Sequence, residues 1–229
     1  MTDTAQHKAR LRAYFDGVGF ERWSAIYGGG ALASRVRRSI RAGHSAMLAQ
    51  AARWLNELPH AAGERALDAG CGTGLWSLEL ARRGYAVRAA DIAPQMVGAT
   101  LEQARASGLA ERVTGEVADL EALGGSYELV SCFDVLIHYP AASARDMLLH
   151  LASLSRGRLL LTYAPRQPLL VALHWVGARF PQGQRHTNIT MLPDAFVRQS
   201  LAEAGFGTVR THRISSGFYH VTLVEAQRI

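Results

Sequence analysis

The sequence predicts an α/β protein whose doubly wound, mostly parallel sheet ends in an antiparallel hairpin. Three observations lead to this fold class. Short apolar runs alternate with helical stretches after Gly63, a glycine-rich turn follows the first run, and the last two strand-like runs have little chain between them. Apolar strands that alternate with helices are typical of a parallel sheet covered on both faces.

Individual strands are expected where apolar runs end in turn-forming residues. Five of these runs precede a helical or turn-forming stretch, which indicates repeated strand–helix units. The two closing runs follow one another directly and indicate a hairpin, which brings the predicted sheet to seven strands. The five are expected at 64–70, 85–91, 111–119, 127–136 and 156–164, and the hairpin at 208–216 and 217–226.

A long helix is predicted over 31–56, before the first strand. Met47 and Trp54 fall on one face of this helix, and Arg38 and Arg41 lie on another. This separation of apolar from charged positions is typical of a helix that packs on a core. The arginines form either a solvated face or a face that meets a ligand, and the residues leave both interpretations open.

Pro59 and Gly63 interrupt the chain after this helix. They divide it into an N-terminal helical arm or lid at 1–56 and an α/β domain at 57–229. Within the domain, the insertion at 165–193 departs from the strand–helix alternation, and much of it is apolar on nearly every helical face. A surface helix needs only one apolar stripe. We therefore expect the insertion to be buried, to cap an apolar substrate or to touch a membrane.

The charge of the chain is concentrated near its N-terminus. The formal net charge of the 229 residues is +6, and Lys8 is the single lysine beside 24 arginines. Residues 1–65 hold ten basic and five acidic residues. Arginine forks onto carboxylates and phosphates. The segment therefore indicates an anionic partner, which is a carboxylated small molecule, a nucleic acid or a membrane surface.

Other features limit the class of protein. The uncharged stretch at 167–178 is too short for a membrane-spanning helix. The first residues lack the apolar core that is typical of a signal peptide. Two cysteines form neither a disulfide framework nor a zinc cluster, and the histidines show no metal-ligand spacing. We therefore expect a cytoplasmic protein with no protein-bound metal.

The turn after the first strand carries the clearest chemical signal. It has the sequence DAGCGTG at 68–74, which spaces three glycines as G-x-G-x-G. Glycine permits a sharp turn and the close approach of a ligand to the backbone. The G-x-G-x-x-G fingerprint of dinucleotide-binding proteins would need a glycine at position 75, which is Leu75 here.

An acidic residue lies at or near the end of each of the first three strands. Asp68 can meet a cationic amino group through charge-assisted hydrogen bonds. Asp91 can accept hydrogen bonds from both hydroxyls of a ribose, and Asp119 is placed to accept from an adenine amino group. Ligands of open α/β sheets bind at these strand ends. Three carboxylates disfavour a pyrophosphate and suit a sulfonium amino acid joined to ribose and adenine.

The glycine turn, Asp91, the Ala-Asp-Leu sequence at 118–120 and the terminal hairpin together resemble class I S-adenosylmethionine-dependent methyltransferases. This resemblance covers about residues 60–229 and implies a Rossmann-like domain with S-adenosylmethionine as methyl donor. The cofactor contacts that we expect on this basis come from Asp68, Ala69, Gly70, Gly72, Asp91, Ile92, Met96, Asp119, Leu120 and Phe133.

A finer resemblance, to magnesium-protoporphyrin IX O-methyltransferases, extends over nearly the whole chain and is weakest at 181–192. That family methylates the 13-propionate of magnesium protoporphyrin IX on the path to chlorophyll or bacteriochlorophyll, and the resemblance implies the same reaction here. It also implies that the substrate carries the magnesium and arrives from the magnesium chelatase large subunit. The segments that carry the resemblance are 14–28, 35–48, 133–140, 162–170 and 214–228.

The resemblance further implies functional roles for Tyr27 and His138. His138 would hydrogen-bond the propionate or ligate the porphyrin magnesium, and Tyr27 would orient the carboxylate. The alternatives are a histidine bonded to loop backbone and an aromatic side chain that packs the arm. Arg38, Arg41 and Trp175 are expected to contact the substrate. A propionate with a pKa of about 4.3 is ionised at neutral pH, so no strong base is needed.

Two other functions remain open from the residues. The basic arm also suits a methyltransferase that acts on RNA or on a quinone-like molecule. However, the fourth strand lacks the Asn/Asp-Pro-Pro-aromatic run used on nucleic-acid amino groups, so no nucleic-acid partner is expected. A non-catalytic binding protein is disfavoured by the intact acids and glycines. A lipophilic substrate and the apolar residues 168–180 predict peripheral contact with the photosynthetic membrane.

Overall fold

The computed structural model describes residues 3–21, 35–58, 61–166 and 189–229. The helices are α1 (Asp3–Phe15), α3 (Arg35–Asn56), α4 (Leu75–Arg82), α5 (Pro94–Ala106), α6 (Ala141–Leu154) and α8 (Asp194–Glu203). The strands are β1 (Arg65–Ala69), β2 (Ala86–Asp91), β3 (Val113–Val117), β4 (Tyr127–Cys132), β5 (Ser155–Pro165), β6 (Met191–Leu192), β7 (Phe206–Ser216) and β8 (Tyr219–Arg228). Three short 3-10 helices are η1 (Ala110–Arg112), η2 (Leu120–Ala122) and η3 (Leu136–His138).

The sheet confirms the predicted fold class. Its strands run in the order β3-β2-β1-β4-β5-β8-β7. The first five strands pair in parallel, whereas β8 pairs antiparallel with both β5 and β7. An eighth strand, β6, pairs with β5 and lies in the insertion where no strand was expected. A strand of two residues is too short for alternation to reveal it in the sequence.

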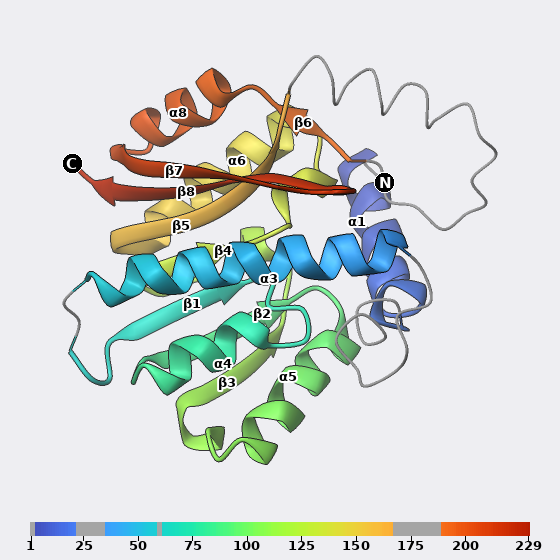
Figure 1. The fold of residues 1–229 in the computed structure, drawn as a ribbon, viewed down its shortest axis with the longest axis vertical. Helices are drawn as coiled ribbons and strands as arrows, with labels where there is room; N and C mark the ends of the chain where they lie inside the picture. The colour runs from blue at the N-terminus through green and yellow to red at the C-terminus, as the bar shows by residue number, and fades with distance from the viewer. Residues whose placement is uncertain (1–2, 22–34, 59–60, 167–188) are drawn as a thin grey trace.

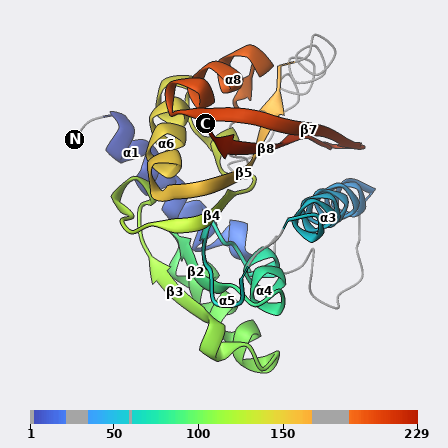
Figure 2. The same cartoon turned by 90° about the vertical axis from the view of Figure 1, so that its left-hand side faces the viewer.

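Helices cover both faces of the sheet (Figures 1 and 2). On one face, Met47 and Trp54 of α3 join Leu78 of α4 and Val97 of α5 in a single apolar cluster. On the other face, side chains of α6 and α8, including Met147, form a second cluster. Strands β1, β4, β5 and β8 are mostly buried, which explains why they are largely apolar, whereas β3 and much of β7 are exposed and more polar.

The two helices of the predicted arm pack on opposite faces of the sheet. Helix α3 lies against β7 and β8, with Gly43, Ala51 and Leu55 among its buried residues. Helix α1 places Leu11 in the cluster formed by α6 and α8. The two elements therefore contribute separately to the core.

The order of the strands reverses between β1 and β4, because β2 and β3 lie to one side of β1 and β5 to the other. In open α/β sheets, ligands bind beyond the carboxyl ends of the strands at such a switch point. The loops after β1, β2 and β4 are therefore placed to form a site.

One predicted helix is described only in part, and one predicted apolar segment lies outside the described residues. The helix predicted from residue 31 is described from Arg35, and the apolar residues 168–180 lie outside the described ranges. The described end of the insertion returns to the sheet through β6, and just before it the Thr190 N–H donates to the Ile137 carbonyl of η3 at 2.7 Å. Among the described helices, none has the combination of length and apolar character that crossing a membrane requires.

Candidate active site

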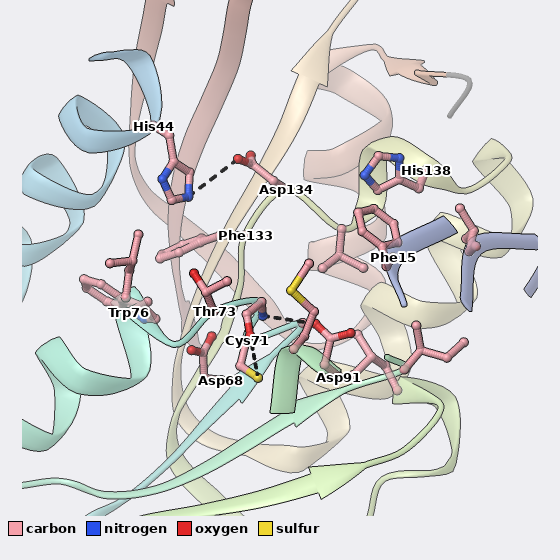
Figure 3. A pocket seen from close by; sticks show the side chains of 18 of the residues that line it. Phe15, His44, Asp68, Cys71, Thr73, Trp76, Asp91, Phe133, Asp134 and His138 are labelled. Carbon is pink, nitrogen blue, oxygen red and sulfur yellow. Dashed lines mark hydrogen bonds and ion pairs between the residues drawn. The ribbon is translucent and has the colours of Figure 1, made fainter. Parts of the chain in front are cut away.

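A cavity opens at the predicted switch point (Figure 3). It encloses about 950 Å3 of empty space, including the part that is open to solvent. Its lining combines the loops after β1, β2 and β4 with side chains from α1, α3 and α4. The lining residues are Leu11, Phe15, His44, Leu48, Asp68, Gly70, Cys71, Gly72, Thr73, Leu75, Trp76, Asp91, Ile92, Met96, Leu120, Phe133, Asp134, Val135, His138 and Tyr139.

The glycine turn forms the floor of one end of the cavity, which we call the cofactor end. Gly70 has φ +84°, and a Cβ there would overlap the side chain of Val135. Its N–H donates to the Ala90 carbonyl at 2.8 Å, which ties the turn to β2. Only glycine combines this left-handed backbone with so little space. The turn therefore brings bare backbone to the cavity wall, as predicted from the spacing.

Asp68 is a buried carboxylate beneath the turn, with an exposed fraction of 2%. Ser77 donates to its Oδ2 at 2.6 Å, and Ser131 lies 3.5 Å from its Oδ1. Burial raises the pKa of Asp68 to about 7, although the hydroxyl of Ser77 opposes the shift. Among the described residues, no cation pairs with this side chain. A buried carboxylate without a cationic partner fits a ligand that brings a positive charge.

Asp91, at the end of β2, holds the turn from the other side. Its Oδ2 accepts from the Gly72 N–H at 3.0 Å, and its Oδ1 accepts from the Ala93 N–H at 2.9 Å. Burial raises its pKa, and these backbone hydrogen bonds oppose the rise. Each carboxylate oxygen can accept more than one hydrogen bond. Asp91 can therefore keep the turn in shape and still accept from a diol in the cavity.

Asp119 is not among the residues that line the cavity, and its carboxylate contacts other parts of the chain. Its Oδ1 accepts from the Glu121 N–H and caps η2, and its Oδ2 forms an ion pair with Lys8 at 2.7 Å. The pair joins α1 to the loop after β3. The lone lysine of the chain thus holds α1 beside the cofactor end, an interaction that the sequence analysis missed.

His138 lies at the opposite end of the cavity, which we call the substrate end. Its carbonyl accepts from His7 Nε2 at 2.7 Å, and its ring packs edge-on against Phe15 with centroids 5.1 Å apart. Burial lowers its pKa to about 4, and His7 adds to the shift. His138 is therefore neutral at physiological pH. Its Nδ1 is buried and has no hydrogen-bond partner among the described residues.

A second histidine, His44 from α3, lines the same end of the cavity and faces Asp134 (Figure 3). The distance from His44 Nε2 to Asp134 Oδ2 is 3.9 Å. The hydroxyl of Tyr219 donates to Asp134 Oδ2 at 2.8 Å, and that of Thr162 donates to Oδ1 at 3.0 Å. Three distant segments thus meet at one carboxylate.

Comparison with known proteins decides which methyltransferases the chain is related to. Residues 132–228 match the family model for the magnesium-protoporphyrin IX methyltransferase C-terminus, and residues 66–156 match a methyltransferase-domain model. The chain is 38% identical to magnesium-protoporphyrin O-methyltransferase of Synechocystis sp. PCC 6803, with 100% of both chains covered. The chain belongs to the magnesium-protoporphyrin O-methyltransferase family. A chloroplastic magnesium protoporphyrin IX methyltransferase of Arabidopsis thaliana is 39% identical over 96% of this chain and 70% of that protein.

Membership of this family is also visible in the fold. The crystal structure of magnesium protoporphyrin IX methyltransferase from Synechocystis PCC 6803 with bound SAH (S-adenosylhomocysteine) matches with a TM-score of 0.88 and 38% identity. The match covers 97% of this chain and 100% of that chain. The similarity therefore includes the N-terminal helices as well as the sheet.

The predicted site residues of this family member fall into three groups. Ala69, Asp119, Arg38 and Arg41 lie outside the cavity lining, and the two arginines are exposed on α3. Tyr27 and Trp175 lie outside the described residues. The remaining predictions meet in one cavity, where they stay predictions of contact: Asp68, Gly70, Gly72, Asp91, Ile92, Met96, Leu120, Phe133 and His138.

Two lining residues at the substrate end were missed by the sequence analysis. His44 shares a helical face with Met47, because residues three apart on a helix lie on one side. Asp134 follows β4 as Asp91 ends β2, so the rule about acids at strand ends applies to it too. In the parts of the chain that the structure covers, no group of three or more potential metal ligands occurs.

Proposed function

We propose that this chain methylates the 13-propionate carboxylate of magnesium protoporphyrin IX, with S-adenosylmethionine as donor, in (bacterio)chlorophyll biosynthesis. The products are the monomethyl ester and S-adenosylhomocysteine. One observation carries the proposal, namely the 38% identity to a magnesium-protoporphyrin O-methyltransferase along the full length of both chains. The cavity geometry agrees with it, because one end carries the glycine turn with Asp68 and Asp91 and the other carries two histidines and Asp134.

The cofactor end suits the charges of the proposed donor. When bound, S-adenosylmethionine supplies a sulfonium-bound methyl group for transfer to the carboxylate oxygen. Asp68 is buried and without a described cationic partner, which supports a contact with the amino group. Asp91 lies at the edge of the same cavity with lone pairs for the ribose hydroxyls. Ile92, Met96 and Leu120 supply apolar walls for the adenine.

The reaction requires the protein to position the carboxylate and the methyl group, and it requires no proton transfer. A propionate is already ionised at neutral pH. The chain has to hold its oxygen about 3–3.5 Å from the methyl carbon, in line with the methyl–sulfur bond, and such positioning supplies roughly 7–11 kcal/mol. The apolar side chains of Phe15, Phe133 and Val135 line the cavity and would exclude water once the ligands fill it.

His138 and Tyr27 are the groups that we assign to the reacting carboxylate. His138 is neutral, so it can donate a hydrogen bond to the propionate or ligate the porphyrin magnesium. A residue that only orients the carboxylate is not required for the chemical step. Replacement by alanine should therefore lower turnover without abolishing it. If His138→Ala changed neither turnover nor porphyrin affinity, this role would be wrong.

The family resemblance also supports three substrate contacts. Arg38 and Arg41 offer guanidinium groups for the propionates, and Trp175 offers an aromatic face for the macrocycle. Hand-over from the magnesium chelatase large subunit and peripheral contact of a cytoplasmic protein with the photosynthetic membrane belong to the same proposal. Co-precipitation with that subunit and co-sedimentation with anionic lipid vesicles test these two interactions.

Methyl transfer to competing acceptors tests the proposed function. Purified protein is incubated with labelled S-adenosylmethionine and, in parallel, with magnesium protoporphyrin IX, a phenolic quinone precursor or bulk RNA. We expect labelled monomethyl ester in equal amount to S-adenosylhomocysteine, and the 13-propionate as the methylated position in the product's NMR spectrum. Transfer to RNA or to the phenol, with none to the porphyrin, would contradict the proposal.

A further inference from the structure

The proposed function does not use the cluster that His44, Thr162 and Tyr219 form around Asp134. Several features of the backbone and of the packing hold this cluster in place. Asp134 has φ +57°, a left-handed backbone that a residue with a side chain rarely adopts. Its own N–H donates to Thr162 Oγ1 at 2.7 Å, and the same hydroxyl donates back to Oδ1. Such strain persists only where the surroundings hold it, and it gathers at functional sites.

A glycine in helix α3 allows the residues of this cluster to pack closely. Gly43 lies in the interior of this helix, where glycine is less favourable than alanine. A Cβ at this position would overlap the ring of Tyr219. The missing side chain lets the ring lie against the helix, and the Tyr219 hydroxyl reaches Asp134 Oδ2 at 2.8 Å. The neighbouring residue in the helix is His44, whose ring packs edge-on against Tyr219.

His44 and Asp134 face each other with the chemistry to bind an acid, provided that His44 gains a proton when the acid binds. Their side chains are only 13% and 11% exposed, and both line the cavity. Burial lowers the pKa of His44, and the Asp134 carboxylate opposes that shift. A second carboxylate in the cavity would act in the same direction as Asp134 and favour the protonated ring. Within the described part of the chain, the charged group that shifts the pKa of His138 is His7 rather than a carboxylate.

We infer that His44 binds a propionate carboxylate of the substrate, in addition to the contact assigned to His138, and that Asp134, held by Tyr219 and Thr162, positions the His44 ring for this contact. His44 then lies between two carboxylates and carries a proton taken from solvent. Asp134 fixes the ring and balances the charge, as a carboxylate behind a histidine does in other sites. The inference rests on the proposed function, because it needs a substrate with a free carboxylate.

Equilibrium binding of two porphyrins separates this role from simple packing. Magnesium protoporphyrin IX and its dimethyl ester are titrated into the protein in the presence of S-adenosylhomocysteine, and binding is followed by porphyrin fluorescence. The wild type should prefer the free acid. His44→Ala should weaken binding of the acid about tenfold or more, as expected for a hydrogen bond to a charged group, and leave the ester within about twofold.

Variants of the supporting residues test the positioning. Asp134→Asn and Tyr219→Phe should each reduce the preference for the acid by a smaller factor, because His44 is still present. Ser45→Ala, an exposed neighbour in the same helix, is the matched control and should match the wild type. Circular dichroism melts establish that each variant is folded.

The outcomes are distinct. Equal weakening of acid and ester by His44→Ala, or no change in either, would overturn the inference. Loss of the acid preference in His138→Ala, with His44→Ala unchanged, would overturn it in favour of His138. A wild-type protein that binds neither porphyrin would overturn the inference and the proposed function together. If the wild type methylates the porphyrin and His44→Ala keeps the preference for the free acid, the inference is overturned and the proposed function stays intact.

Discussion

The polar groups of the cofactor end come from residues 68–91, whereas those of the substrate end come from residues 44, 134 and 219. At the first end, N–H groups of the turn donate to the Asp91 carboxylate and to the Ala90 carbonyl of the neighbouring strand, and Asp68 lies beneath the same turn. At the second, a helix, a strand end and the closing hairpin converge on one carboxylate. The polar groups of the cofactor end come from residues that are close in sequence, whereas the substrate end depends on how distant segments pack.

The difference has a chemical counterpart. The cofactor end presents fixed carboxylates and bare backbone to a cationic ligand. The substrate end presents two half-buried histidines with opposite surroundings, since His44 faces Asp134 whereas His138 is near His7. Fixed carboxylates suit a positive donor, whereas a negative acceptor needs a cation beside it, which a protonated His44 facing Asp134 would supply.

The largest effect is expected for Asp91→Ala. The substitution removes the acceptor of the Gly72 N–H and the groups that would hold a diol, each a hydrogen bond to a charge. We expect the affinity for S-adenosylhomocysteine to fall about 100-fold. Isothermal titration measures it, with Glu102→Ala, an exposed acid of α5, as the control. Unchanged affinity in Asp91→Ala would show that the turn alone defines the cofactor end.

A pH titration of cofactor binding should show the charge state of Asp68. Its pKa in the folded protein is about 7, above the ordinary value of 3.8, so it gains a proton as the pH falls through 7. Only the ionised form attracts an amino group. The affinity for S-adenosylhomocysteine should therefore fall about tenfold between pH 8 and pH 6.

The same shift predicts the opposite trend for the stability of the protein without ligand. The unfolded chain ionises at a lower pH than the buried side chain, so the free energy of unfolding should decrease as the pH rises from about 4 to about 7. Asp68→Asn should flatten both dependences. If the affinity and the free energy of unfolding keep their pH dependence in Asp68→Asn, another group is responsible for it.

Gly43→Ala tests the packing of the substrate end. Alanine in a helix interior normally stabilises by up to about 1 kcal/mol relative to glycine. Here the added methyl group would overlap Tyr219, so the free energy of unfolding should fall by about 1–2 kcal/mol. Gly98→Ala in α5 is the matched control, because no atom lies within 4 Å of its added Cβ, and it should stabilise the protein. Urea unfolding of both variants shows whether each substitution raises or lowers the free energy of unfolding.

The smallest effect is expected for Lys8→Met. Its ion pairs with Asp119 and Glu121 join α1 to the cofactor end, but the carboxylates are a third exposed. Partly exposed ion pairs contribute about 1 kcal/mol or less. We expect the affinity for S-adenosylhomocysteine to change less than about threefold. A tenfold loss would make α1 an essential wall of the cofactor end.

The contrast between the two ends explains what could be predicted from the sequence. The strands, the glycine turn and the acids at the strand ends are local signals, because alternation and turn chemistry are encoded in neighbouring residues. The role of His44 was missed because its partner Asp134 is brought near only by the packing of α3 on the sheet. Asp119 was assigned to adenine from its position alone, and its pair with Lys8 depends on where α1 docks.

The hairpin was predicted as well, but the use of its Tyr219 hydroxyl was not. That contact needs Gly43 in a helix far away in the sequence and Asp134 in a strained loop. No period or spacing reports such a combination. The substrate end is therefore the part of a site like this one for which a structure adds most.

Cross-titration of two variants tests the separation of the two ends most directly. Asp91→Ala and His44→Ala are each titrated with S-adenosylhomocysteine and, separately, with magnesium protoporphyrin IX. If the ends act independently, Asp91→Ala loses the nucleoside and keeps the porphyrin, whereas His44→Ala keeps the nucleoside and loses most of its affinity for the porphyrin free acid. Equal loss of both ligands in both variants would show a single interdependent site and would contradict this division.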